Sequence, residues 1–294
     1  MSSEHASPPL ASPTQEPCPT PLSWQDIVQQ VDAHASRLHF QWDGGQVDGM
    51  ELGEGPPLVF LPTASSTARM FALTAWLLRD DFRTVLLNPI RNTSYQSTAV
   101  EAQNLGDALR NHLTGPYSLY GCGTGAGLAV QVAAKFPGAV QRLVLQGGGF
   151  GVSLAWTERL MLQIGRWFRR PVRNVPLWLA AQLRNHGPWF PPFDGTRFTF
   201  AVQEMGATRC SDVAERLLNA SASPDLSVTD AIKCPTLILQ CEGQGKAVNN
   251  RCEEFAQSIA NASLEGMHTA GMLPFLTHPH RLVKLLRAFL ASND

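Results

Sequence analysis

A glycine-rich segment at residues 119–128 has the spacing of a turn that carries catalytic nucleophiles. It reads Leu-Tyr-Gly-Cys-Gly-Thr-Gly-Ala-Gly-Leu. In the pattern Gly-x-Ser-x-Gly, a strand turns sharply into a helix and exposes a serine hydroxyl that can attack a carbonyl carbon. Here Gly121 and Gly125 hold the framing positions, and Gly123 holds the position of the serine. Glycine has no nucleophilic side chain, so the segment predicts the turn but not a catalytic nucleophile.

A turn of this kind could also bind a phosphate group. Gly121, Gly123 and Gly125 match part of the dinucleotide-binding pattern Gly-x-Gly-x-x-Gly. That pattern expects an acidic residue about 20 positions further along the chain, and residues 143–149 contain none. The nucleophile turn is therefore favoured, and a generic tight turn between a strand and a helix remains the alternative.

Strand-like and helix-like segments alternate over most of the chain, which predicts an α/β fold with a parallel sheet. Expected strands lie at residues 39–42, 47–52, 57–62, 84–88, 117–121, 140–146, 234–239 and 262–267. Expected helices lie at residues 24–36, 70–78, 99–113, 126–136, 250–259 and 279–290. Residues 150–229 contain helix-like stretches and four tryptophans but no clear strand, which predicts a helical lid.

These patterns divide the chain into four parts. Residues 1–22 are rich in Ser, Pro, Thr and Ala and are expected to form a disordered tail. Residues 23–149 and 230–294 are expected to form the two parts of one α/β core, with the lid of residues 150–229 inserted between them.

The order of these motifs resembles the α/β-hydrolase superfamily over roughly residues 40–292. Two stretches are most similar to maspardin-type members: residues 60–65, Phe-Leu-Pro-Thr-Ala-Ser, and residues 271–276, Gly-Met-Leu-Pro-Phe-Leu. The resemblance implies a mostly parallel central sheet flanked by helices. It also implies a binding or adaptor role, because maspardin-type proteins are regarded as binding proteins.

Members of this superfamily that transfer acyl groups place a serine, an acid and a histidine in that chain order. Aligned on the resemblance, the acid position after the strand at residues 234–239 falls on Gln244. The alternative acid position follows the preceding strand and reads Gly-Gly-Gly at residues 147–149. The base position falls on Met272. Together with Gly123, these residues form a degenerate triad, so no catalytic residue is assigned.

Five other residues are expected near a pocket above the turn: Thr63, Ser65, Cys122, Thr124 and His268. The backbone N–H of Thr124 is a candidate donor to a carbonyl oxygen or an oxyanion. Cys122 or His268 could support displaced chemistry, although a buried thiol and a surface histidine are the favoured interpretations.

Composition excludes several function classes. The 294 residues are 44% hydrophobic with a net charge of −1, which gives no general attraction to nucleic acid. The histidines and six cysteines show no metal-ligand spacing and no Cys-x-x-Cys pair, so we expect no metal or cofactor. The same cysteine pattern predicts a reducing, cytoplasmic location. No apolar run reaches the length of a membrane span.

The lid carries a basic and aromatic group that is a candidate partner-binding surface: Arg166, Trp167, Arg169 and Arg170. A solvated helix face is the alternative. The leading interpretation is a catalytically inactive α/β-hydrolase-fold protein that binds a protein partner or a small ligand. The alternative is an enzyme of the same fold, such as a lyase, an isomerase or an atypical esterase, with chemistry that needs no triad.

Overall fold

A mostly parallel sheet runs through the computed structural model, which describes residues 22–93, 96–147, 154–192, 194–221 and 226–292. Its strand order is β1-β2-β4-β3-β6-β7-β8-β9, and the short β5 pairs with β2. The strands are β1 (Ser36–Trp42), β2 (Gly45–Leu52), β3 (Pro57–Leu61), β4 (Arg83–Leu87), β5 (Arg91–Asn92), β6 (Tyr117–Cys122), β7 (Val140–Gln146), β8 (Thr236–Cys241) and β9 (Ala262–Met267). Strand β2 is antiparallel to β1, β4 and β5, and the other neighbouring pairs are parallel.

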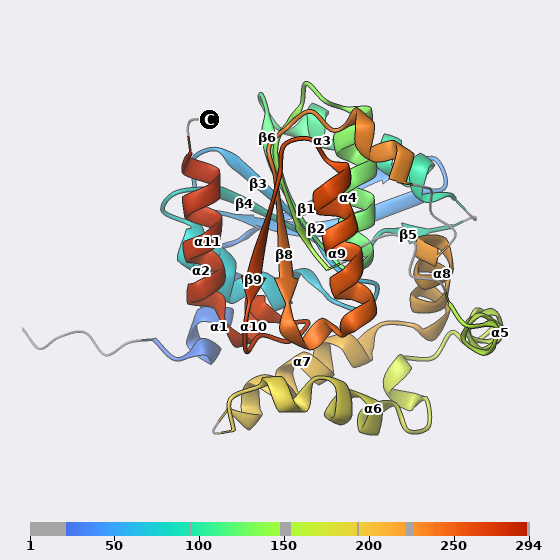
Figure 1. Cartoon of the computed structure of the whole chain (residues 1–294). Coiled ribbons are helices and arrows are strands. Elements are labelled where there is room, and N and C mark those ends of the chain that lie inside the picture. Colours follow the sequence, from blue (N-terminus) through green and yellow to red (C-terminus); the bar gives the residue numbers. More distant parts are fainter. Residues whose placement is uncertain (1–21, 94–95, 148–153, 193, 222–225, 293–294) are drawn as a thin grey trace, which may run out of the picture.

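Helices cover both faces of this sheet (Figure 1). One face packs against α1 (Trp24–His34), α2 (Ala72–Leu78), α10 (Pro274–Thr277) and α11 (Pro279–Ala291), and the other against α3 (Thr98–His112), α4 (Thr124–Lys135) and α9 (Lys246–Ser258). Because both faces are covered, the central strands read as continuous apolar runs rather than alternating ones. All six residues of β6 are buried, for example.

The local signals that begin helices agree with the structure. The Ser23 hydroxyl accepts a hydrogen bond from the Asp26 N–H, and the Asp26 carboxylate accepts one from the Ser23 N–H. This reciprocal pair satisfies free donors at the first turn of α1. Helix α4 begins at Thr124, two residues earlier than the sequence predicts, because Gly123 turns the chain directly from β6 into the helix.

Four helices follow β7: α5 (Trp156–Gly165), α6 (Trp178–Asn185), α7 (Gly195–Ala207) and α8 (Cys210–Ser221). We call this region the helical insertion. Its described residues form no strand before β8, as the sequence predicts, and α5 and α6 lie at its outer edge (Figure 1). The Trp189 ring packs so closely on Gly243 and Gly271 that a Cβ atom there would lie 2.3 Å and 2.6 Å from Trp189 atoms.

Two further expectations concern the N-terminal tail and membrane-spanning helices. The predicted tail at residues 1–22 lies, except for Leu22, outside the described residues. Among the described residues, no helix is long and apolar enough to cross a membrane.

Candidate functional site

Gly123 occupies the sharp turn between β6 and α4, at φ 53° and ψ −121°. Its N–H donates to the Gln146 carbonyl at 3.0 Å, which fixes the turn to the end of β7. The framing glycines allow close backbone approach: a Cβ on Gly125 would lie 2.3 Å from the Leu61 carbonyl oxygen. The chain therefore keeps the strained geometry of a nucleophile turn while carrying a residue that relieves the strain.

A cavity of about 290 Å³ opens above this turn. All three degenerate triad positions, Gly123, Gln244 and Met272, line it, so the alignment on which they rest brings them to one place. Of the other expected pocket residues, Thr63 and Thr124 also line it. The remaining described lining residues are Ala64, Gln146, Gly147, Leu154, Leu217, Ala220, Ser221 and Val248.

None of these described lining residues has an ionisable side chain. The polar groups are the hydroxyls of Thr63, Thr124 and Ser221 and the carboxamides of Gln146 and Gln244. A hydroxyl becomes an effective nucleophile only when a neighbouring base takes its proton. The described part of the lining supplies no such base, and no group of three metal-ligating side chains occurs among the described residues.

Gln146, which sequence reasoning did not single out, connects the pocket to the loop that carries Met272. It ends β7, and its side chain is buried. The Tyr120 hydroxyl donates to Gln146 Oε1, and Gln146 Nε2 donates to the Met272 carbonyl at 3.0 Å. Burial raises the pKa of Tyr120 well above its usual value, so its hydroxyl remains a donor. The sequence feature that could have identified Gln146 is a carboxamide residue at the end of an apolar strand, directly before a glycine.

Gln244 lies in a short turn after β8 and faces Gly147. Its Oε1 atom is buried and has no hydrogen-bond partner among the residues that the structure describes. An unpaired buried acceptor costs free energy, about 1–3 kcal/mol. A ligand that donates an N–H or O–H to this atom would recover that cost.

The other side of the pocket can bind an oxygen. Thr124 is the first residue of α4, and the first N–H groups of a helix have no carbonyl partner within it. The positive end of the helix dipole also lies here. The sequence-based expectation that Thr124 could donate to a carbonyl oxygen therefore fits its position at the pocket.

Three pocket candidates, Ser65, Cys122 and His268, lie outside the described lining, and the buried thiol and surface histidine favoured from the sequence are what the structure shows. Cys122 is fully buried in the core, where its thiol contacts the Leu61 carbonyl at 3.6 Å and burial strongly raises its pKa. The Ser65 carbonyl accepts from the Thr208 hydroxyl at 3.2 Å. His268 is exposed at the end of β9. Within the described lining, therefore, neither a thiol nor a histidine base faces the pocket.

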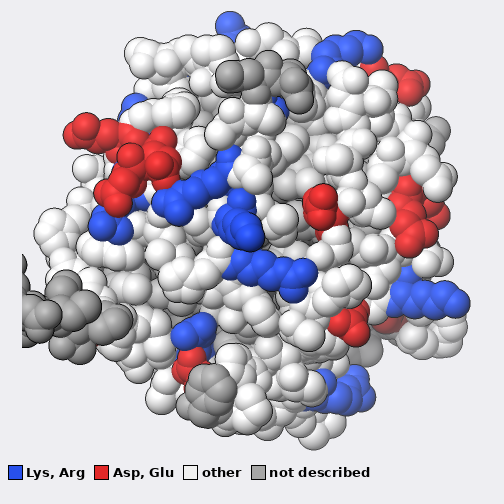
Figure 2. Space-filling view, turned by 60° about the vertical axis from the view of Figure 1, so that its left-hand side comes forward, with Lys and Arg blue, Asp and Glu red and all other residues white. Residues whose placement is uncertain are grey.

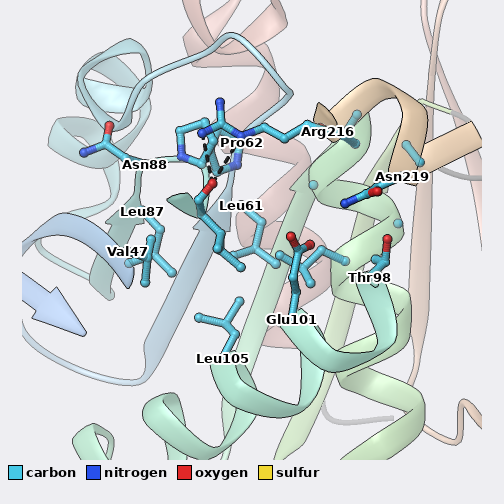
Figure 3. Close-up of a pocket in the computed structure, with 17 residues that line it drawn as sticks. Val47, Leu61, Pro62, Leu87, Asn88, Thr98, Glu101, Leu105, Arg216 and Asn219 are labelled. Carbon is cyan, nitrogen blue, oxygen red and sulfur yellow. Dashed lines mark hydrogen bonds between the residues drawn. The ribbon is translucent and has the colours of Figure 1, made fainter. Parts of the chain in front are cut away.

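A separate cavity of about 50 Å³ lies between α3, α4 and α8 (Figure 3). Arg216 of α8 donates two hydrogen bonds to the Ile90 carbonyl, drawn as dashes in Figure 3, and one to the Ala64 carbonyl. Glu101 lies at the same cavity, accepts from Asn92 Nδ2 at 2.6 Å, and has a pKa raised by burial. Arg216 thus ties the helical insertion to the loop that carries pocket residue Ala64.

The expected partner-binding group, Arg166, Trp167, Arg169 and Arg170, follows α5 in the helical insertion. All four side chains are exposed, and Trp167 is 87% exposed. None of the four belongs to the described lining of the pocket above Gly123.

Comparison with known proteins is consistent with this architecture. No protein-family model matches the chain. A pyrrolizixenacetamide deacetylase from Xenorhabdus hominickii is 26% identical over 184 residues, which cover 61% of this chain and 67% of that protein. A thermophilic esterase from Thermogutta terrifontis has a TM-score of 0.70 at 20% identity, covering 87% of this chain and 98% of that one. An esterase from Exiguobacterium antarcticum has a TM-score of 0.71 at 15% identity, covering 85% and 97%. The chain therefore adopts the α/β-hydrolase fold, with a mostly parallel sheet flanked by helices.

Proposed function

We propose that this chain is a non-hydrolytic α/β-hydrolase-fold protein that binds a small ligand in the pocket above Gly123. One observation carries the proposal: the described pocket lining contains neither an ionisable side chain nor a nucleophile with a base beside it. Acyl transfer needs both. The similarity of residues 60–65 and 271–276 to maspardin-type proteins is a further reason for a binding role.

The lining also suggests the chemistry of the ligand. Leu154, Leu217 and Val248 give the pocket apolar walls, which suit an uncharged ligand. The N–H of Thr124 can donate to a carbonyl oxygen of that ligand, and Gln244 Oε1 can accept from an N–H or O–H group. A small amide or hydroxy ester has both functions.

The alternative is an enzyme of this fold whose chemistry needs no triad. The relative named as a deacetylase favours this alternative, because it is similar over about two thirds of its own length. Among the described lining residues, only Thr63, Thr124 and Ser221 have a hydroxyl that a hydrolytic version could use as its nucleophile. The two functions differ in one measurable quantity, which is turnover of a bound ester.

The test uses p-nitrophenyl butyrate and its anilide analogue, p-nitrobutyranilide. Calorimetric titration should detect binding, while release of p-nitrophenol or p-nitroaniline stays at the buffer rate. Val248→Trp fills the pocket and should abolish binding, whereas Val100→Trp on the exposed side of α3 should not. Repeated turnover above the buffer rate would contradict the proposal and favour the enzyme. Failure of both probes to bind the wild type would contradict the pocket assignment.

A further inference from the structure

Exposed apolar side chains gather on one part of the helical insertion. Ten of the fourteen exposed large hydrophobic residues among the described residues lie between positions 156 and 183. They are Trp156, Leu160, Met161, Ile164, Trp167, Phe168, Val175, Leu177, Leu179 and Leu183. Single exposed apolar residues are normal, but a gathering of this size marks an interaction surface. We call residues 156–185 the α5–α6 face.

Helix α5 presents these residues away from the protein. Its Gly165 packs against α8, where a Cβ atom would lie 3.2 Å from the Ala214 methyl carbon. Trp156, Leu160 and Ile164 recur every four residues and so form one stripe on the opposite side of the helix. Their exposed fractions are 77%, 52% and 52%, so the stripe has no partner among the described residues.

The α5–α6 face is also strongly basic. It contains six arginines, all exposed, and a single acidic residue, Glu158, although the whole chain has a net charge of −1. The arginines are Arg159, Arg166, Arg169, Arg170, Arg173 and Arg184. On the face drawn in Figure 2, basic and acidic side chains both occur in small groups.

This combination points to one kind of occupant. A symmetric contact with a second copy would place arginines opposite arginines with almost no acid between them. A surface of anionic phospholipids satisfies both features, since phosphate headgroups pair with arginines while tryptophan and aliphatic side chains enter the interface. We propose that the α5–α6 face docks on the surface of an anionic phospholipid membrane without spanning it.

Docking there would place the ligand pocket beside the membrane. Leu154, which directly precedes α5, lines the pocket, as do Leu217 and Ala220 of α8. The docking residues themselves are absent from the described lining, so membrane binding and ligand binding can be tested separately. The inference stands whether or not the proposed function holds.

The test is co-sedimentation of the full chain with phosphatidylcholine vesicles, with and without phosphatidylglycerol. We expect binding only to the anionic vesicles, weakened by added salt, with a blue shift of tryptophan emission. The variant R166S/R169S/R170S should bind on the order of 100-fold more weakly, because each arginine contributes about a factor of five near an anionic surface. The matched variant R37S/R110S/K284S removes three exposed cations from other helices and strands and should bind almost as the wild type does.

A second variant tests the apolar stripe. W156S/L160S/I164S should abolish the blue shift and vesicle binding, whereas V100S/L264S, exposed elsewhere, should not. All these side chains are exposed, so the melting midpoints should stay near that of the wild type. If the triple variant is unstable, Leu160→Ser alone should still weaken binding about tenfold.

Three results would overturn the proposal. The wild type could fail to bind anionic vesicles. The R166S/R169S/R170S and R37S/R110S/K284S variants could lose affinity equally. The W156S/L160S/I164S change could leave vesicle binding intact while dissociating a dimer or releasing an acidic protein partner, which would assign the α5–α6 face to a protein interface.

Discussion

Replacing Gly123 by alanine should lower the free energy of unfolding, because the turn leaves little room for a Cβ atom and has an unfavourable backbone conformation for alanine. The new Cβ atom would lie 3.1 Å from the Thr63 Cβ and 3.4 Å from its Cγ2, so Thr63 must shift by a few tenths of an ångström. The backbone at φ 53° and ψ −121° is also one that residues with a side chain rarely adopt. Such a conformation costs about 1–3 kcal/mol for a residue other than glycine.

Urea unfolding of the wild type and Gly123→Ala measures this cost. We expect a lower free energy of unfolding for the variant and a fall in Tm on the order of 2–6 °C. Gly195→Ala is the matched control: its Cβ meets no atom within 4 Å, and it lies at the start of α7. Gly195→Ala should leave stability unchanged or raise it by less than about 1 kcal/mol. A Gly123→Ala variant as stable as the wild type would refute the strained turn.

Three further predictions follow from the pocket and its surroundings. Arg216→Met removes the donor to the Ile90 and Ala64 carbonyls, so the free energy of unfolding in urea should fall by about 2–4 kcal/mol. Proteolysis of the helical insertion should also accelerate. An unchanged free energy of unfolding and an unchanged proteolysis rate would contradict this prediction. Burial raises the pKa of Glu101 in the folded state, so stability falls as pH rises from the unfolded pKa through the folded one. Glu101→Gln should therefore match or exceed the wild type in Tm at neutral pH, and this advantage should vanish in acid. A lower neutral Tm would argue against it. The combined change Gly123→Ser, Gln244→Asp and Met272→His should hydrolyse p-nitrophenyl acetate faster than Gly123→Ser alone, because triad members act as a unit; equal rates would mean that the three side chains do not meet.

The fold was predictable because its signals are local. Apolar runs such as those of β6 and β7 specify buried parallel strands, and Ser23 with Asp26 specifies the start of a helix. The glycine spacing at residues 121–125 also predicted the tight turn, since close backbone approach leaves no room for a side chain there. These patterns depend on neighbours in sequence.

The pocket was only partly predictable, because its lining depends on contacts between distant segments. Gln146 gained its place from hydrogen bonds to Tyr120 and Met272, which no local pattern encodes. Cys122 lies one position before Gly123, yet the alternation of side chains along β6 turns its thiol into the core. His268, which follows the last residue of β9, is exposed, in agreement with the surface histidine that the sequence analysis favoured.

In the helical insertion, the sequence shows which residues are present but not which of them are exposed. Its tryptophans and arginines were visible in the sequence, but a tryptophan that packs on a core reads the same as one that faces solvent. The structure separates them: Trp189 packs on Gly243 and Gly271, whereas Trp156 and Trp167 are exposed. Exposure, rather than composition, distinguishes the surface that we propose for docking.

Reaction with a serine-directed fluorophosphonate, followed by intact-protein mass spectrometry, tests the absence of an activated nucleophile most directly. The probe needs only an activated hydroxyl, and the residues described around the pocket above Gly123 offer hydroxyls without a base. We predict that the wild-type mass stays unchanged under conditions that label an active serine esterase to completion. A single stoichiometric adduct, mapped to Ser221, Thr63 or any other hydroxyl of the chain, would contradict the proposal that this α/β-hydrolase fold binds its ligand without hydrolysing it.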